Sequence, residues 1–161
     1  MTDQLDDVLR RKILVELQRN GRLTNQELAE RVGASPSPVW RRVRDMEESG
    51  VIRRYAALLD PEAVGIGECV FAQVTIEKHN REMYQNFERV VGSLPEVLEC
   101  YALTGDADFI LKIHVRSVRD YDRLLTDHLF RIPGVQHLKS SFTLREIKFE
   151  TALPVRGADE D

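Results

Sequence analysis

The stretch TNQELAERVGASPSPVWRRVRDMEESG, residues 24–50, decides the fold of the first half of the chain. Thr24 and Glu27 have the spacing of a capping box, in which each side chain hydrogen-bonds the backbone N–H of the other residue. This pattern predicts a helix that runs to Val32, where the following Gly33 ends it. A turn of a few residues containing that glycine then leads into a second predicted helix.

The second predicted helix begins at Ser35 and ends before Gly50. Ser35 is its expected N-cap, and Pro36 takes the first helical position, where no backbone N–H is needed. With 3.6 residues per turn, two opposite faces of this helix differ in polarity. The apolar face comprises Val39, Val43 and Met46, and the polar face comprises Ser37, Arg41, Arg44 and Glu48.

A helix before this pair, from Leu5 to Asn20, is predicted by its apolar stripe of Leu9, Ile13, Leu14 and Leu17. The three helices together have the order of a helix-turn-helix, whose second helix enters the major groove of DNA. The candidate DNA-binding residues are Ser35, Ser37, Pro38, Arg41, Arg42 and Arg44. A plain three-helix bundle is also compatible with the pattern.

The next run, Val51–Leu59, is predicted to be a strand that connects two domains, because Asp60-Pro61 follows it as a turn signal. We therefore divide the chain into residues 1–60, a helix-turn-helix domain with its linker strand, and residues 61–161. The first part has a formal net charge of +1 and the second −5.

The second half alternates strand and helix patterns. Strands are predicted at 70–76, 97–104, 109–115 and 135–145, with helices at 83–94 and 118–129. The motifs Leu-Pro-Glu-Val (94–97) and Ile-Pro-Gly-Val (132–135) make the two strand-helix-strand copies look like repeats. The predicted fold is α+β: a winged-type helix-turn-helix followed by a ferredoxin-like βαββαβ domain.

One face of this sheet is expected to lack a helical cover, because both helices of such a unit lie on the other face. Its residues are partly apolar and include Phe71, Gln73, Tyr101 and Leu103. A half-apolar bare face is a candidate dimer interface. Antiparallel sheets also tolerate one amphipathic face in water.

A polar turn, Thr104-Gly105-Asp106-Ala107-Asp108, separates two apolar strands. A carboxylate there could hold an ammonium group while backbone N–H groups or the hydroxyl hold a carboxylate, so the turn is a candidate site for a free amino acid. Glycine and aspartate are equally typical of a simple β-turn.

We find no catalytic motif: no phosphate-binding loop, no Gly-x-Ser-x-Gly, no His-Glu-x-x-His and no Cys-x-x-Cys. The four histidines, His79, His114, His128 and His137, lack metal-ligand spacing. Only a chance pairing of His114 with His137 across strands would bring two of them together. We predict no enzyme activity, no metal and no cofactor other than an amino-acid effector.

The composition, 42% hydrophobic and 31% charged, is that of a globular protein. No apolar run approaches the length of about 20 residues that a membrane helix needs, and the N-terminus has no apolar signal-peptide core. We therefore expect a cytoplasmic protein with no membrane partner. Cys69 and Cys100 are then expected to be buried thiols and not a disulfide.

The sequence resembles the Lrp/AsnC family, the feast/famine regulators of transcription that respond to amino acids. The resemblance extends from about Leu9 to Leu153 and is carried by three stretches. They are NGRLTNQELAERVGASPSPVWRRVRDMEESGVIRRYAALLDPEAVG (20–65), LTGDADFILKIHV (103–115) and RIPGVQHLKSSFTLREIKFETALP (131–154). The chain departs from the family at Arg10, where an aspartate is common.

The resemblance implies a homodimer formed through sheet faces and linker strands, which often assembles further into an octamer. It places Ser35, Ser37, Pro38, Arg41 and Arg42 on the recognition helix. The candidate amino-acid site comprises Thr104, Gly105, Asp106 and Asp108, with Ser140 and Ser141 contributed by a neighbouring subunit. The C-terminal SSFTLREIKFETALP looks like a branch that responds to leucine, methionine or cysteine.

Sequence reasoning thus predicts a regulator that binds double-stranded DNA and a free amino acid. One alternative is a nucleoid-structuring protein that wraps DNA with little site preference, which would show a salt dependence of binding without a sequence preference. The other is an amino-acid-sensing module that regulates an enzyme, which would not bind duplex DNA.

Overall fold

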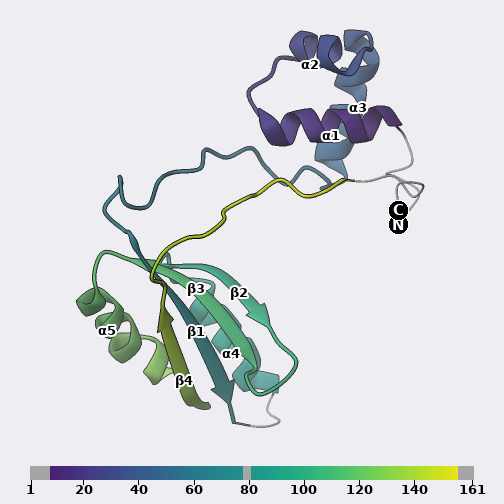
Figure 1. Ribbon diagram of the computed structural model, residues 1–161. Helices are drawn as coiled ribbons and strands as arrows, with labels where there is room; N and C mark the ends of the chain where they lie inside the picture. The colour runs from purple at the N-terminus through teal and green to yellow at the C-terminus, as the bar shows by residue number, and fades with distance from the viewer. Residues whose placement is uncertain (1–7, 78–80, 156–161) are drawn as a thin grey trace. The chain divides into compact units, whose positions relative to one another are not determined.

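The computed structural model describes residues 8–77 and 81–155 of the 161-residue chain, and it divides into two units (Figure 1). The first, the helical unit, consists of residues 8–58 together with residues 148–155. The second, the sheet unit, spans Leu59–Ile147. Each unit has its own hydrophobic core.

The helical unit contains the three predicted helices: α1 (Val8–Arg19), α2 (Asn25–Val32) and α3 (Pro36–Glu48). The part of the predicted first helix that precedes Val8 lies outside the described residues. Helix packing buries a single cluster made of Ile13, Leu14, Leu28, Ala29, Val32, Val39 and Met46. The apolar stripes predicted for the three helices therefore form the core of this unit.

Local capping sets the ends of α2. The backbone N–H of Glu27 donates to Thr24 Oγ1 (3.2 Å), and the Thr24 N–H donates to Glu27 Oε2 (2.8 Å), so the capping box is confirmed. Gly33 ends the helix with φ of 70°, a left-handed conformation that glycine adopts at little cost. Ser35 occupies the N-cap position of α3, but its side chain makes no capping hydrogen bond.

Residues 51–59 contain no strand, contrary to our prediction. A strand requires a hydrogen-bonded neighbour, and in the described part of the chain none pairs with this extended segment. Tyr55, Leu58 and Leu59 are 48–69% exposed in it. The predicted apolar run is therefore present, but residues 8–77 and 81–155 supply no strand that pairs with it.

The predicted domain 61–161 also needs correction, because its C-terminal part packs with the helical unit. The Gln18 side chain of α1 accepts from the Leu153 N–H (2.6 Å) and donates to the Leu153 carbonyl (3.1 Å). Val155 packs against the helical core. These long-range contacts join residues 135 positions apart, which no local pattern reveals.

The sheet unit has the predicted βαββαβ order, and it is a ferredoxin-like α+β fold. Its elements are β1 (Glu68–Ile76), α4 (Arg81–Val91), β2 (Val97–Ala102), β3 (Phe109–Val115), α5 (Val118–Asp127), the 3-10 helix η1 (Leu129–Arg131) and β4 (Val135–Phe142). The sheet has the strand order β2-β3-β1-β4, with antiparallel neighbours throughout.

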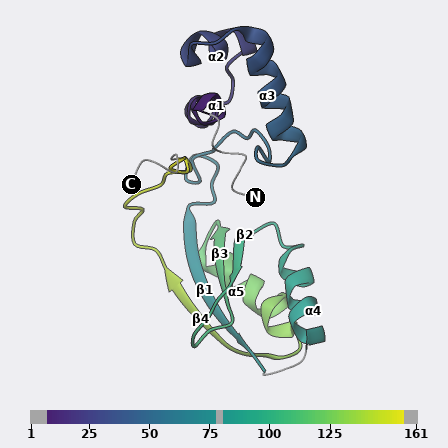
Figure 2. The same ribbon diagram turned by 90° about the vertical axis from the view of Figure 1, so that its right-hand side faces the viewer.

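Helices α4 and α5 cover one face of this sheet (Figure 2). On the covered face, alternate residues of β1 and β3 such as Val74, Leu111 and Ile113 are fully buried, because strand side chains alternate between faces. None of the described helices covers the opposite face (Figure 2). Its predicted members Phe71, Tyr101 and Leu103 are 38%, 56% and 41% exposed.

The structure answers three smaller predictions. Both cysteines are free, but neither is buried as predicted: Cys69 is half-buried, and Cys100 is exposed because β2 is an edge strand with neighbours on one side only. His114 lies opposite Cys69 and His137 opposite Thr75, so the two histidines do not pair. Within the described residues, no helix is long and apolar enough to cross a membrane, and no group of three potential metal ligands occurs.

Candidate DNA-binding and effector sites

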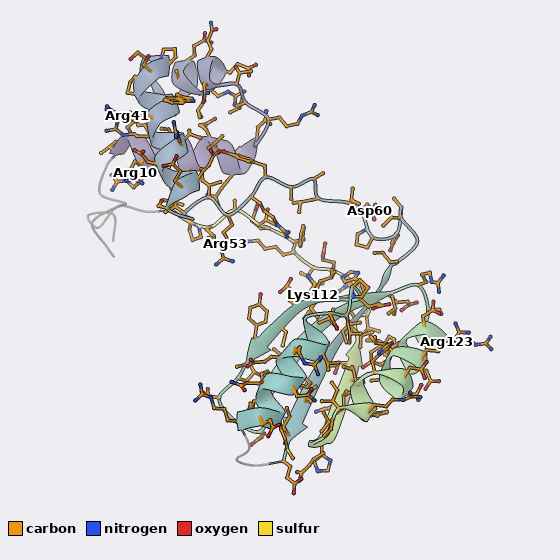
Figure 3. The ribbon with its side chains drawn as sticks, turned by 180° about the vertical axis from the view of Figure 1, so that it is seen from behind. Arg10, Arg41, Arg53, Asp60, Lys112 and Arg123 are labelled. Atoms are coloured by element: carbon orange, nitrogen blue, oxygen red, sulfur yellow. The ribbon has the colours of Figure 1, made fainter. Side chains whose placement is uncertain are left out.

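Helix α3 presents the predicted DNA-binding residues on the surface of the helical unit. Ser35, Ser37, Arg41 and Arg44 are exposed, whereas Pro38 and Arg42 are half-buried on the flanks. Figure 3 shows Arg41 pointing outward from the helix. The opposite face carries the buried Val39 and Met46, so core packing orients the polar face toward solvent.

The two exposed arginines of this face differ in their surroundings. Arg44 Nε lies 2.6 Å from Glu48 Oε1, and this ion pair raises the pKa of the guanidinium. No carboxylate among the described residues pairs with Arg41. Arg41 therefore offers its guanidinium fork to an external partner such as guanine or phosphate, while Arg44 must first leave Glu48.

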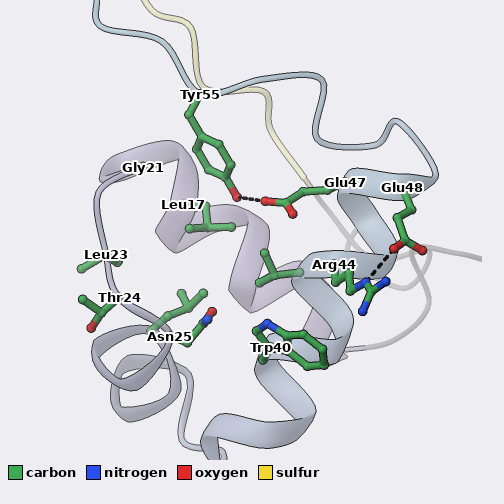
Figure 4. A pocket seen from close by; sticks show the side chains of 12 residues that line it. Leu17, Gly21, Leu23, Thr24, Asn25, Trp40, Arg44, Glu47, Glu48 and Tyr55 are labelled. Atoms are coloured by element: carbon green, nitrogen blue, oxygen red, sulfur yellow. Dashed lines mark hydrogen bonds and ion pairs between the residues drawn. The ribbon is translucent and has the colours of Figure 1, made fainter.

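Trp40 is a surface residue of α3 that sequence reasoning missed. Its side chain is 50% exposed, and the Arg44 guanidinium carbon lies 5.6 Å from its ring centroid (Figure 4). The signal was available in the sequence, because Trp40 follows Ser37 by three residues and precedes Arg44 by four, which places it on the same helical face.

Tyr55 holds the start of the linker against the helical unit. Its hydroxyl donates to Glu47 Oε1 (2.9 Å), and burial together with this hydrogen bond raises the pKa of Tyr55 to about 12. A Cβ on Gly21 would lie 3.2 Å from the tyrosine ring, so the glycine permits the close approach. Tyr55 and Trp40 both line a cavity of about 650 Å³ in this unit (Figure 4).

The polar turn predicted as the amino-acid site joins β2 and β3. The Leu103 N–H donates to the Asp108 carbonyl (2.8 Å), which closes the turn. Gly105 has φ of 123°, a conformation that side chains disfavour. Thr104, Gly105 and Asp106 are exposed, and thus accessible to a ligand.

Asp108 differs from Asp106 because both of its carboxylate oxygens already accept hydrogen bonds. Oδ2 accepts from the Ile76 N–H at the end of β1 (2.7 Å), and Oδ1 accepts from the Tyr84 hydroxyl of α4 (2.7 Å). The bond to the carboxylate raises the pKa of Tyr84. The Asp108 carboxylate thus ties the turn to β1 and α4. Sequence reasoning missed Tyr84, since no local spacing shows that its hydroxyl reaches a carboxylate 24 positions away.

Ser140 and Ser141 do not join this turn within one chain. In the sheet register they lie opposite Ala72 and Phe71, midway along β1, whereas Asp108 contacts the end of that strand at Ile76. The two serines also face opposite ways. The Ser140 hydroxyl lies 2.6 Å from the Tyr121 hydroxyl of α5, on the covered face, so Ser141 belongs to the bare face.

Two family models match the chain, one for each function suggested by the geometry. Residues 6–53 match a winged helix-turn-helix DNA-binding model, which includes all of α1, α2 and α3. Residues 69–153 match the Lrp/AsnC ligand-binding domain, which includes the sheet and the turn at 104–108.

Relatives with known roles are similar over nearly the whole chain. The leucine-responsive regulatory protein of Escherichia coli is 37% identical over 150 residues, which are 93% of this chain and 92% of that protein. A transcriptional regulator from Neisseria meningitidis, solved as a complex with L-Met, is 45% identical with a TM-score of 0.88, covering 92% of this chain and 96% of that one. An AsnC family transcriptional regulator from Agrobacterium tumefaciens is 40% identical with a TM-score of 0.87, at 92% and 97% coverage.

These relatives are regulators of transcription, which confirms the prediction of a regulator in place of an enzyme. The helix-turn-helix surface on α3 and the ligand-binding sheet unit occur in the order expected for such proteins. The chain belongs to the Lrp/AsnC family of DNA-binding transcription regulators.

Proposed function

We propose that this protein is a sequence-specific regulator that reads duplex DNA through α3 in response to a free amino acid. The observation that carries the proposal is the outward face of α3, where Arg41 has no internal ion pair among the described residues. Ser35, Ser37 and Pro38 precede it at the helix start, the part of a recognition helix that approaches base edges. Arg42 and Arg44 supply further positive charge toward phosphates.

The proposed effector is an amino acid of the leucine, methionine or cysteine class. The L-Met complex of the Neisseria relative and the leucine response of the E. coli relative support this class. The proposed site is the turn with Thr104, Gly105 and Asp106, where Asp106 takes the ammonium group. Ser141 is proposed to complete it from a neighbouring subunit, while Ser140 and Asp108 support the site from within the fold.

The proposed assembly is a homodimer that builds an octamer. Two observations support association: the bare sheet face exposes Phe71 and Tyr101, and no strand in the described part of the chain pairs with the apolar segment 51–59. Unpaired extended segments and large apolar patches promote association. As a DNA regulator the protein is proposed to act in the cytoplasm.

We expect light scattering at micromolar concentration to give a mass at least twice the 18.5 kDa of one chain. Replacing Phe71 with lysine should shift the mass downward, because a charge at the centre of the bare face must be desolvated on association. Val118→Lys, at a side chain 60% exposed on α5, is the control and should leave the mass unchanged. A monomeric parent protein would contradict the proposed assembly.

Replacing Arg41 with alanine is expected to weaken specific DNA binding by about 1–3 kcal/mol, because a base contact by arginine contributes about that much. Affinity is to be measured by fluorescence anisotropy on a duplex selected from a random library and on a scrambled duplex, at several salt concentrations. The control is Arg123→Ala in the sheet unit, whose guanidinium is also exposed (Figure 3).

The result separates the proposed function from the nucleoid-structuring alternative. A loss confined to the selected duplex supports base recognition. An equal loss on both duplexes would make Arg41 a phosphate contact, and a parent protein with no preference for the selected duplex would favour the alternative.

A further inference from the structure

We infer that Trp40 is a specificity-determining residue of α3 that reads the 5-methyl group of thymine. The inference rests on the proposed recognition of DNA through α3. It goes further because it assigns the recognition of one base to an apolar side chain, whereas the arginines and serines beside it are polar. Thymine is the only base of DNA that presents a methyl group in the major groove.

The position of Trp40 makes it part of the outward face. Its neighbour Val39 is fully buried, whereas half of the Trp40 side chain is exposed. Burying a tryptophan is strongly favourable, so an exposed indole in this place is better explained by a partner than by packing. Ser37, Arg41 and Arg44 share its face and are all exposed. The one acidic residue of this polar face, Glu48, lies at the far end of the helix and pairs with Arg44, so the part of the face near Ser37 and Arg41 suits a nucleic acid.

A hollow next to the indole has the chemistry of a pocket for a methyl-bearing base edge. Its volume is about 540 Å³, and it is lined by Asn25, Pro36, Ser37, Pro38, Trp40 and Arg41. Two proline rings and the indole provide apolar walls for the methyl group. Asn25 and Ser37 provide donors for the adjacent O4 atom of thymine. Both side chains can also accept from the amino group of cytosine, so the methyl group is the feature that distinguishes thymine at this hollow.

An arginine of the same helix lies over the indole ring. The Arg44 guanidinium lies 5.6 Å from the ring centroid, and Glu48 holds that guanidinium through the 2.6 Å ion pair. Figure 4 shows Trp40, Arg44 and Glu48 following one another along α3. A guanidinium over one face of the ring restricts the orientations that the ring adopts, and a restricted side chain loses less conformational freedom on binding.

The unmodified protein allows a first test, since Trp40 is its only tryptophan. The indole emission should change when the selected duplex is added and should change less with a scrambled duplex. Each thymine of the selected duplex is then replaced in turn by deoxyuridine, which removes only the methyl group. At least one replacement should weaken binding about fourfold, because burying one methyl-sized group changes an affinity by about that factor.

The variant Trp40→Ala, measured on the thymine and deoxyuridine duplexes, completes a double-mutant cycle. Its affinity for the thymine duplex should fall about fourfold, and it should no longer distinguish thymine from deoxyuridine at that position. Phe130→Ala is the matched control: an aromatic side chain of the sheet unit with 57% exposure, whose loss should leave the discrimination intact. Circular dichroism establishes whether Trp40→Ala retains its helices.

The outcomes are distinguishable. Specific binding with equal affinity for thymine and deoxyuridine at every position overturns this inference and leaves the proposed function standing, as does unchanged indole emission. Discrimination that survives Trp40→Ala also overturns it. If the parent protein selects no sequence at all, the proposed function fails, and the role of Trp40 fails with it. If Trp40→Ala does not fold, the indole emission of the parent protein decides: its change must be smaller with the discriminating deoxyuridine duplex than with the thymine duplex, and equal changes overturn the inference.

Discussion

Replacing Asp108 with alanine is expected to lower the free energy of unfolding of the sheet unit by about 3–5 kcal/mol, since a hydrogen bond to a charged group contributes about 1.5–3 kcal/mol. Asp108 accepts two such bonds, from the Ile76 N–H and the Tyr84 hydroxyl, both at 2.7 Å. Ile76 is 1% exposed, so its freed N–H finds water only if the end of β1 moves.

Urea denaturation followed by circular dichroism measures the overall effect, and hydrogen exchange at the Ile76 amide measures the local one. Tyr84→Phe removes one of the two bonds and should show roughly half the loss. Asp106→Ala, in the same turn but exposed, is the control and should be as stable as the parent protein. If Asp108→Ala matches the parent in stability and in Ile76 exchange, the carboxylate has no structural role.

Asp106→Asn is expected to reduce the affinity for the amino-acid effector about 10- to 100-fold. A charge-assisted hydrogen bond to an ammonium contributes about 1.5–3 kcal/mol, and about 1.4 kcal/mol corresponds to a factor of ten. Asparagine keeps the shape and the turn preference of aspartate but removes its negative charge. We expect Asp106, and not Asp108, to hold the ammonium group. Asp106 is exposed, whereas both carboxylate oxygens of Asp108 already accept hydrogen bonds within the fold.

The effector for this measurement is whichever of leucine, methionine and cysteine raises the melting temperature most. Isothermal titration calorimetry then compares the parent protein, Asp106→Asn and the control Asp122→Asn, which removes an exposed aspartate from α5. DNA affinity and mass should be the same for all three without effector. Parent-like binding by Asp106→Asn would place the ammonium elsewhere, and a loss in Asp122→Asn as well would point to a general charge effect.

Local sequence patterns were sufficient for the three helices of the helical unit and for the order of strands and helices in the sheet unit. The capping box at Thr24 and Glu27 and the left-handed Gly33 involve residues within one or two turns of each other, so propensity and spacing predict them. Alternation along β1 and β3 likewise predicted which side chains are buried, because successive strand residues face opposite ways. The same reasoning placed Arg41 on the exposed face of α3.

Only the tertiary structure decided how distant groups are paired. The contact of Asp108 with Tyr84 spans 24 residues, and that of Gln18 with Leu153 spans 135. Such bonds depend on how helices pack on the sheet or on the other helices, and no local periodicity encodes them. The apolar run at 51–59 shows the converse: its sequence favours a strand, yet a strand forms only where another segment supplies hydrogen bonds. The sequence alone thus determined the family and the local elements, while packing determined that Asp108 supports the fold and left Asp106 open to a ligand.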